Sequence, residues 1–259
     1  MPEIMIAAAL IGSVAAGILD LKTTEVPDWL PIGMVIGGAA YWFVSWIITN
    51  DIYPLTVSLV LGTLVLALGL ILFYKKQWGE ADAWILAAVA YMIPLYNNNI
   101  FFYDYIFNFL IVAIAYLLVY SLILGLKNKK VFGSFIADIK EKWHIVIAPP
   151  AAAAIASIII PQLYLLAFLF FFLMLFWRYA LAVENSVFKK KIHVSRLKVG
   201  DVLLKDKWVG VTKEDIERLK KYKAYVTIKD GIRFVPVFAI TIAVTLLWGN
   251  VFASIFLNL

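Results

Sequence analysis

The chain of 259 residues contains no cysteine. Disulfide bonds, thiolate metal sites and cysteine nucleophiles are therefore excluded. Histidine is almost as scarce, and neither His144 nor His193 has a partner at metal-ligand spacing. We interpret both histidines as surface or interfacial residues, and we expect neither a metal ion nor a cofactor.

Charge is also scarce. Only 15% of the residues are charged, whereas about 25% are charged in a soluble domain. Hydrophobic residues make up 64% of the chain, compared with about 45–50% in a soluble domain. A chain of this composition has too little polar surface to cover a water-soluble globule of its size. Its 15% aromatic content, with nine tryptophans, suits the belts that anchor a protein at membrane interfaces. The composition predicts an all-α polytopic membrane protein.

The hydrophobic runs predict about eight transmembrane helices. A helix needs about 20 apolar residues to cross the hydrocarbon. Six segments approach that length: 4–20, 30–48, 55–73, 106–126, 163–183 and 235–257. Two more, 82–96 and 145–161, are shorter or contain prolines that we expect to kink or delay the helix, so six or seven spans remain open. The first run lacks a basic segment before it and a convincing cleavage site after it, so we interpret it as a retained helix.

The basic residues test this count. With eight alternating spans, one side receives loops 21–29, 74–81, 127–144 and 184–234, which hold almost all the lysines and arginines of the chain. The opposite loops, 49–54 and 97–105, contain no Lys or Arg, and only Arg178 lies within a span. The positive-inside rule then places the basic loops in the cytoplasm and both termini outside. The net charge of +6 therefore indicates a membrane surface and not a nucleic acid.

Segment 184–234 is the longest polar stretch, with fourteen basic and seven acidic residues. Its pattern predicts a small cytoplasmic α+β domain. We expect short strands at 192–197, 202–204, 225–228 and 232–235, with Asp230-Gly231 as a hairpin turn between the last two. We expect a helix from a Thr212 cap to about Tyr222. The predicted organisation is a transmembrane catalytic domain (1–183), this basic domain (184–234) and a final helix (235–259).

Two acidic residues stand at the ends of predicted spans. Asp20 closes the first helix and Asp82 opens the fourth, and the topology places both at the cytoplasmic side at similar depth. Charged groups near membrane depth are costly and are functional candidates by default. Asp138 and Asp104 are interpreted as loop residues.

Two neighbouring carboxylates can share one proton, because both cannot ionise cheaply at close range. The ionised partner then takes a proton from an attacking water, and the protonated partner polarises the scissile carbonyl. Simpler readings stay open: Asp82 as a cap that meets the helix dipole, or either acid solvated at the interface. Further alternatives are a transporter or proton-coupled membrane protein that uses the same acids, and a non-enzymatic membrane assembly component.

At these residues the chain resembles the archaeal prepilin and preflagellin (archaellin) peptidases, membrane aspartyl proteases with a GxGD-type motif. One matching pattern is Asp20-Leu21-Lys22 followed by Glu25-Val26-Pro27-Asp28-Trp29-Leu30. The other is Gly79-Glu80-Ala81-Asp82, in which Ala81 replaces the second glycine of the strict motif. The motifs cover about 20 residues, and the predicted topology extends the likeness along most of the chain.

The resemblance implies that Asp20 and Asp82 are catalytic, with motif support from Gly79, Ala81, Lys22 and Pro27. It implies a multi-pass protein of the cell membrane that removes a short basic leader from a pilin-like or archaellin precursor. Cleavage is expected at the cytoplasmic face, with membrane lipids around the protein and no cofactor. Bacterial relatives often carry a cysteine-rich insertion and methylate their product. Because this chain has no cysteine and a short first loop, we expect proteolysis alone.

Overall fold

The computed structural model describes residues 2–256 except 76, 205–209, 223 and 230. Within this part of the chain, five helical stretches are long and apolar enough to cross a membrane: Glu3–Thr23, Trp29–Thr49, Tyr53–Tyr74, Phe101–Lys127 and Ala167–Phe188. A shorter apolar helix covers Pro236–Trp248. The prediction of a helical polytopic membrane protein is confirmed. The number of eight spans stays a prediction.

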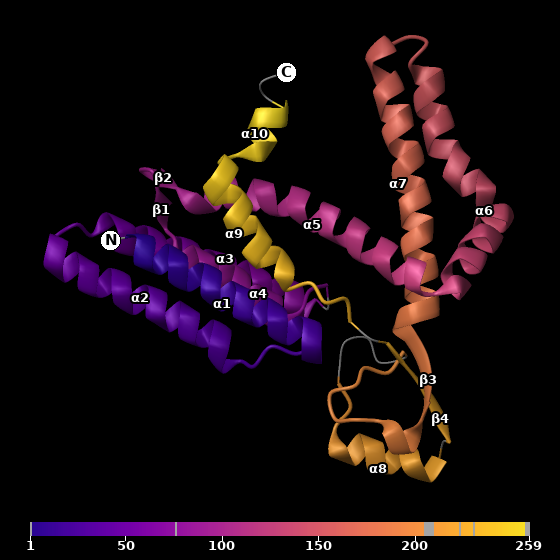
Figure 1. Ribbon diagram of the computed structural model, residues 1–259, viewed down its shortest axis with the longest axis horizontal. Coiled ribbons are helices and arrows are strands. Elements are labelled where there is room, and N and C mark those ends of the chain that lie inside the picture. Colours follow the sequence, from indigo (N-terminus) through magenta and orange to yellow (C-terminus); the bar gives the residue numbers. More distant parts are fainter. Residues whose placement is uncertain (1, 76, 205–209, 223, 230, 257–259) are drawn as a thin grey trace. The chain divides into compact units, whose positions relative to one another are not determined.

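The chain divides into two compact units, which we describe separately. Unit 1 comprises Met1–Tyr116 and Ile232–Leu259, and unit 2 comprises Leu117–Gly231. In unit 1, helices α1 (Pro2–Thr23), α2 (Trp29–Thr49) and α3 (Tyr53–Tyr74) run side by side and surround α4 (Glu80–Met92) (Figure 1). The short predicted span 82–96 therefore forms a helix of only 13 residues.

Helix α4 is the core of unit 1. Every residue from Ile85 to Pro94 is buried, because α1, α2 and α3 all pack against this helix. Glycines allow the close approach: a Cβ atom at Gly62 would lie 2.4 Å from the ring of Tyr91. The helix ends inside the unit, where side chains replace the missing helical donors. The Ser58 hydroxyl donates to the Tyr91 carbonyl at 2.7 Å, and the Trp42 indole N–H donates to the Met92 carbonyl at 3.2 Å.

A tight hairpin connects α4 to the next long helix. Strands β1 (Leu95–Tyr96) and β2 (Asn99–Ile100) pair antiparallel, and both turn residues, Asn97 and Asn98, have positive φ angles. Helix α5 (Phe101–Lys127) follows directly and leads from unit 1 into unit 2. Its first turn includes Asp104, so the loop assignment of this residue was wrong.

The predicted final span 235–257 is broken. Helix α9 (Pro236–Trp248) ends at Gly249, whose φ of 64° ends the helix, and α10 (Val251–Phe256) follows. The fully buried Asn108 of α5 binds this break from both sides. Its amide donates to Thr245 Oγ1 at 3.0 Å and to the Gly249 carbonyl at 2.6 Å, and its Oδ1 accepts from the Val251 N–H at 2.9 Å.

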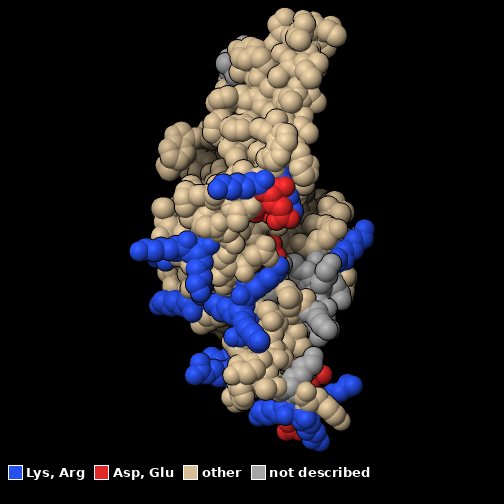
Figure 2. Space-filling view, turned by 90° about the vertical axis from the view of Figure 1, so that its right-hand side faces the viewer, with Lys and Arg blue, Asp and Glu red and all other residues tan. Residues whose placement is uncertain are grey.

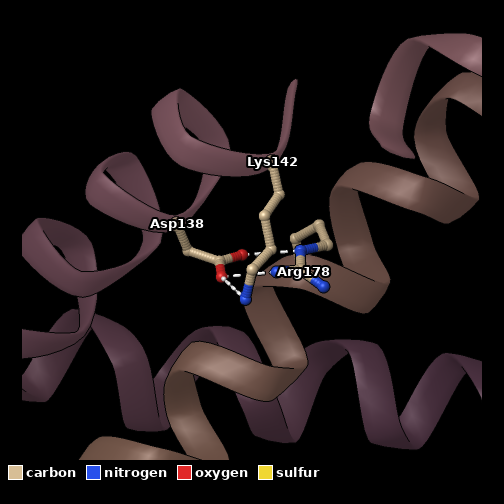
Figure 3. A network of polar contacts seen from close by, with 3 residues as sticks. All are labelled: Asp138, Lys142 and Arg178. Atoms are coloured by element: carbon tan, nitrogen blue, oxygen red, sulfur yellow. Dashed lines mark hydrogen bonds and ion pairs between the residues drawn. The ribbon is translucent and has the colours of Figure 1, made fainter. Parts of the chain in front are cut away.

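Unit 2 contains an antiparallel pair of long helices, α6 (Lys129–Ala156) and α7 (Tyr164–Val183) (Figure 1). The expectation of a loop at 127–144 was wrong, because α6 starts at Lys129. Helix α6 also passes through both prolines, and its only non-helical dihedral angles lie at Lys142. Asp138 is therefore helical, and its carboxylate accepts hydrogen bonds from the Arg178 guanidinium of α7 (Figure 3). This pair joins α6 to α7.

The basic segment of unit 2 forms a small module with its own apolar core of Val194, Leu197, Val211, Val226 and Ile228. Strand β3 (Lys189–His193) pairs antiparallel with β4 (Tyr225–Lys229). Helix α8 (Lys213–Tyr222) confirms the predicted helix and its cap: the Thr212 hydroxyl accepts from the Asp215 N–H at 3.2 Å. On the face of the chain drawn in Figure 2, Lys and Arg side chains are more prominent than Asp and Glu side chains.

The other strand predictions for this module were less accurate. The predicted strand at 192–197 starts earlier, at Lys189, and stops at His193, where a 3-10 turn (Val194–Arg196) begins. Residues 202–204 contribute only isolated bridges, from Val202 to Gly210 and from Leu203 to Ile228. The predicted strand at 232–235 is wrong, because these residues are an irregular entry to α9. Asp230 of the proposed turn lies outside the described residues.

Candidate active site

Asp20 lies in the last complete turn of α1. The helix stops shortly after it, where Thr24 adopts a φ of 62° and donates its N–H to the Asp20 carbonyl at 2.9 Å. The Asp20 side chain is 6% exposed although it is ionisable. Its Oδ2 atom accepts a hydrogen bond from the backbone N–H of Val235 at 3.1 Å. Asp20, at the end of α1, is thus bound to the start of α9.

Gly17 makes this contact possible. It lies one turn before Asp20, on the same face of α1. A Cβ atom at Gly17 would lie only 3.1 Å from the Cα atom of Pro236, which is tighter than a normal contact. The missing side chain therefore lets the beginning of α9 approach α1 closely enough for the Val235 N–H to reach Asp20.

Asp82 lies in the first turn of α4, three residues after the N-cap Gly79. Gly79 is extended (φ −75°, ψ 147°), and the Asp82 carboxylate turns back toward it. This is the arrangement of a capping box, in which an acid at the third helical position reaches the N-cap amide. A Cβ atom at Gly79 would lie 2.7 Å from Asp82 Oδ2, which explains why the motif needs a glycine at this position.

The two carboxylates belong to the same end of unit 1, because α1 finishes where α4 starts (Figure 1). Helices α1 and α4 are in contact, and the charge of Asp20 acts on Asp82. Among the residues that the structure describes, no Lys or Arg forms an ion pair with either carboxylate. The site therefore combines two acids with backbone amide donors only. Such a pair suits proton sharing better than permanent charge neutralisation.

The supporting residues of the two motifs have structural positions. Lys22 and Pro27 are exposed, and the Pro27 carbonyl accepts the Leu30 N–H at 3.0 Å in the turn that starts α2. Ala81 is partly buried and packs against the core of unit 1. Both histidines lie in unit 2, where His193 Nδ1 is 2.8 Å from Ser195 Oγ and His144 lies in α6.

Sequence reasoning missed the contribution of residues 233–235. The Val235 amide carries no mark in the sequence, because every residue except proline has such a donor. Arg233 was counted only as one of the basic residues before the last helix. Its charge acts on Asp20 although the two residues form no ion pair.

Residues 7–126 match the model of the type IV leader peptidase family. This part of the chain is similar to that family. Both aspartates, all four motif-support residues and the whole of α4 lie within the matched residues. The family is one of peptidases, so the match indicates a leader peptidase that acts on pilin-like precursors in general. No curated protein and no solved structure matches the chain.

Proposed function

We propose that this leader peptidase is a membrane aspartyl endopeptidase and that Asp20 and Asp82 are its catalytic residues. Its substrate would be a type IV pilin-like or archaellin precursor with a short basic leader before an apolar helix. The observation that carries the proposal is the placement of two acids at one end of unit 1, inside the residues that match the family, where no described Lys or Arg forms an ion pair with either acid.

The chemistry requires one ionised and one protonated carboxyl group. The ionised group takes a proton from a water molecule while the water oxygen attacks the scissile carbonyl carbon. The protonated group donates its hydrogen bond to the carbonyl oxygen as charge develops there. When the tetrahedral intermediate collapses, the C–N bond breaks and the leaving amine receives a proton from the pair. The pair then holds a single proton, as it did at the start, and is ready for another turnover.

We infer that cleavage takes place at the cytoplasmic face. The support is the distribution of charge: the loops on the Asp20 and Asp82 side carry the basic residues, and the opposite loops 49–54 and 97–105 carry none. At a helix end, water reaches the carboxylates while the apolar helix of the precursor stays in lipid. A site at mid-membrane would need a separate path for water.

A cleavage assay tests the proposal. The purified full-length chain in detergent is mixed with a pilin-like precursor and, separately, with an archaellin precursor, and release of the leader is followed by mass spectrometry. We expect Asp20→Asn and Asp82→Asn each to abolish release. Asp51→Asn is the matched control, because Asp51 is exposed and its Oδ1 only accepts the Tyr53 N–H at 3.0 Å, which an asparagine oxygen also does.

Normal cleavage by either site variant would overturn the assignment of catalytic residues. The two precursors distinguish pilin-like from archaellin substrates. If the wild-type chain cleaves neither precursor, and reconstituted vesicles instead show a cation flux that depends on both aspartates, the transporter alternative would replace the protease.

A further inference from the structure

The entry to α9, residues 232–235, approaches the candidate site from a distant part of the sequence. Val235 is 215 residues after Asp20, yet its N–H donates to the Asp20 carboxylate and both residues are buried. Val235 is the N-cap of α9, so its amide belongs to the group of helix-terminal donors that favour an anion. Among the described residues, Val235 provides the donor that forms a hydrogen bond with the Asp20 side chain.

Aromatic residues of α5 hold this entry segment in place. The Tyr116 hydroxyl donates to the Arg233 carbonyl at 2.5 Å. The ring of Phe234 packs edge-on against Phe109 and Tyr116, with centroids 5.9 and 6.5 Å apart. The segment is therefore irregular in backbone but fixed in position. Because the segment is already ordered, little conformational entropy is lost when its N–H orients a carboxylate.

The Arg233 side chain supplies a second, unexplained observation. Its Nε atom is buried, and it has no hydrogen-bond partner among the residues that the structure describes. A buried donor without a partner costs about 1–3 kcal/mol, and native proteins rarely keep one without a reason. The guanidinium charge also acts on Asp20. Arg233 lies two residues before Val235, whose N–H binds Asp20, so the unpaired Nε atom is consistent with a role of Arg233 at this site.

We propose that the entry to α9 positions the catalytic Asp20, with the Val235 amide and the Arg233 guanidinium as its two working parts. The amide fixes the direction of the carboxylate, and the guanidinium places a positive charge behind it without neutralising it in an ion pair. Arg233 is thus a positioning residue and does not touch the scissile bond. The proposal rests on the proposed aspartyl peptidase activity and assigns a function to a segment outside the family match.

Val235→Pro tests the amide. The φ angle of Val235 is −54°, within the range of proline, and Phe234 before it is not helical, so the substitution removes the N–H with little change of backbone. Val235→Ala is the matched control, because it removes side-chain atoms and keeps the donor. We expect kcat for leader release to fall about 10–100-fold in Val235→Pro with KM unchanged, and to fall less in Val235→Ala, which keeps the N–H donor.

Arg233→Gln and Arg233→Lys test the charge. Glutamine keeps a polar side chain of similar length without the charge, and we expect it to lower kcat about tenfold with KM unchanged. Lysine keeps the charge, and we expect it to restore most of the rate. A residue that only supported the fold would not distinguish these two variants. Thermal unfolding in detergent verifies that each variant is folded, and the Val235 pair remains informative if an Arg233 variant is not.

The outcomes distinguish a failure of the positioning proposal from a failure of the proposed function. If wild-type protein releases the leader and Asp20→Asn abolishes release, but Arg233→Gln and Val235→Pro retain the wild-type kcat, the positioning proposal is wrong and the proposed function stands. Equal losses in Arg233→Lys and Arg233→Gln, or a change confined to KM, would also overturn it. If Asp20→Asn still cleaves, the proposed function itself fails.

Discussion

The carboxylates of the two units have opposite surroundings. In unit 2, Asp138 accepts two hydrogen bonds from the buried Arg178 and has Lys142 at 3.5 Å (Figure 3). In unit 1, no described Lys or Arg forms an ion pair with Asp20 or Asp82, and the Asp20 carboxylate accepts a hydrogen bond from the backbone N–H of Val235. A bidentate arginine gives a half-buried carboxylate two charge-assisted hydrogen bonds in a fixed geometry. Two acids without such a partner are poised to exchange a proton.

This difference fits the proposed division of roles, in which Asp138 is a structural acid and Asp20 and Asp82 are the catalytic pair. Each unit keeps an ionisable side chain at least partly away from water, which costs free energy. In unit 2 the opposite charge of Arg178 offsets that cost, and the ion pair joins α6 to α7. In unit 1 no ion pair among the described residues offsets it, a pattern that fits residues kept for function at the expense of stability. The following predictions test whether this division holds.

The largest expected effect is on catalysis by unit 1. Asp82→Asn should reduce leader release by at least about 10⁴-fold, because neither proton transfer proceeds with one carboxyl group. The same substitution should not lower the thermal stability of the protein, since it removes one of two acids that repel each other. Parallel cleavage and detergent unfolding measurements verify this. A variant that loses activity and stability together would show that Asp82 has a structural role as well.

The opposite pattern is expected for unit 2. Asp138→Ala leaves the Arg178 guanidinium, 5% exposed, without its acceptor. Removing one partner of a buried pair costs about 3–5 kcal/mol, so we expect a loss of this size in the free energy of unfolding of unit 2, with leader release retained while the protein is folded. Unfolding is measured in detergent by an intrinsic probe in α7, such as the fluorescence of Trp177 isolated in a reduced-tryptophan background.

The control for this prediction replaces the whole pair. Asp138→Leu combined with Arg178→Met exchanges two charges for apolar side chains of similar volume, which is often neutral or stabilising. We expect the double variant to regain most of the stability that Asp138→Ala loses. Failure to regain it would mean that Asp138 supports unit 2 through something other than the ion pair.

These contrasts show which features follow from sequence alone. The locations of Asp20 and Asp82 at helix ends follow from hydrophobic run length, and the Thr212 cap follows from residue type, because both signals are local. Partners far apart in the chain have no such signal. The Asp138–Arg178 pair spans 40 residues and the Val235–Asp20 bond spans 215. The break at Gly249 likewise depends on Asn108, which resembles any other residue of a long apolar helix until α9 packs beside it.

A smaller effect is expected from Gly79→Ala. The backbone of Gly79 is in an ordinary extended conformation, so alanine strains no dihedral angle, but its Cβ would lie 2.7 Å from Asp82 Oδ2. The carboxylate must then turn away, and misplacing a reacting group by about 1 Å costs up to about 100-fold in rate. We expect leader release to fall about 10–100-fold. Gly133→Ala is the control, because no atom lies within 4 Å of a Cβ there. Equal rates in both variants would contradict the packing explanation of the motif glycine.

The smallest effect concerns the cap of α8, in the solvent-exposed module of unit 2. Asp215 accepts the Thr212 N–H at 3.0 Å and its hydroxyl at 2.8 Å, and these bonds lower the pKa of the Asp215 carboxyl below its usual value. A lowered folded-state pKa means that the cap is fully stabilising above the unfolded value, about 4, and is lost as the pH falls through the folded value. Hydrogen exchange of the full-length protein should therefore show weaker protection of α8 at acidic pH. Asp215→Ala should remove this pH dependence, whereas Glu214→Ala, one residue before it in the same turn, should keep it. A pH dependence that survives in Asp215→Ala would assign the effect to another group and leave α8 without a titrating cap.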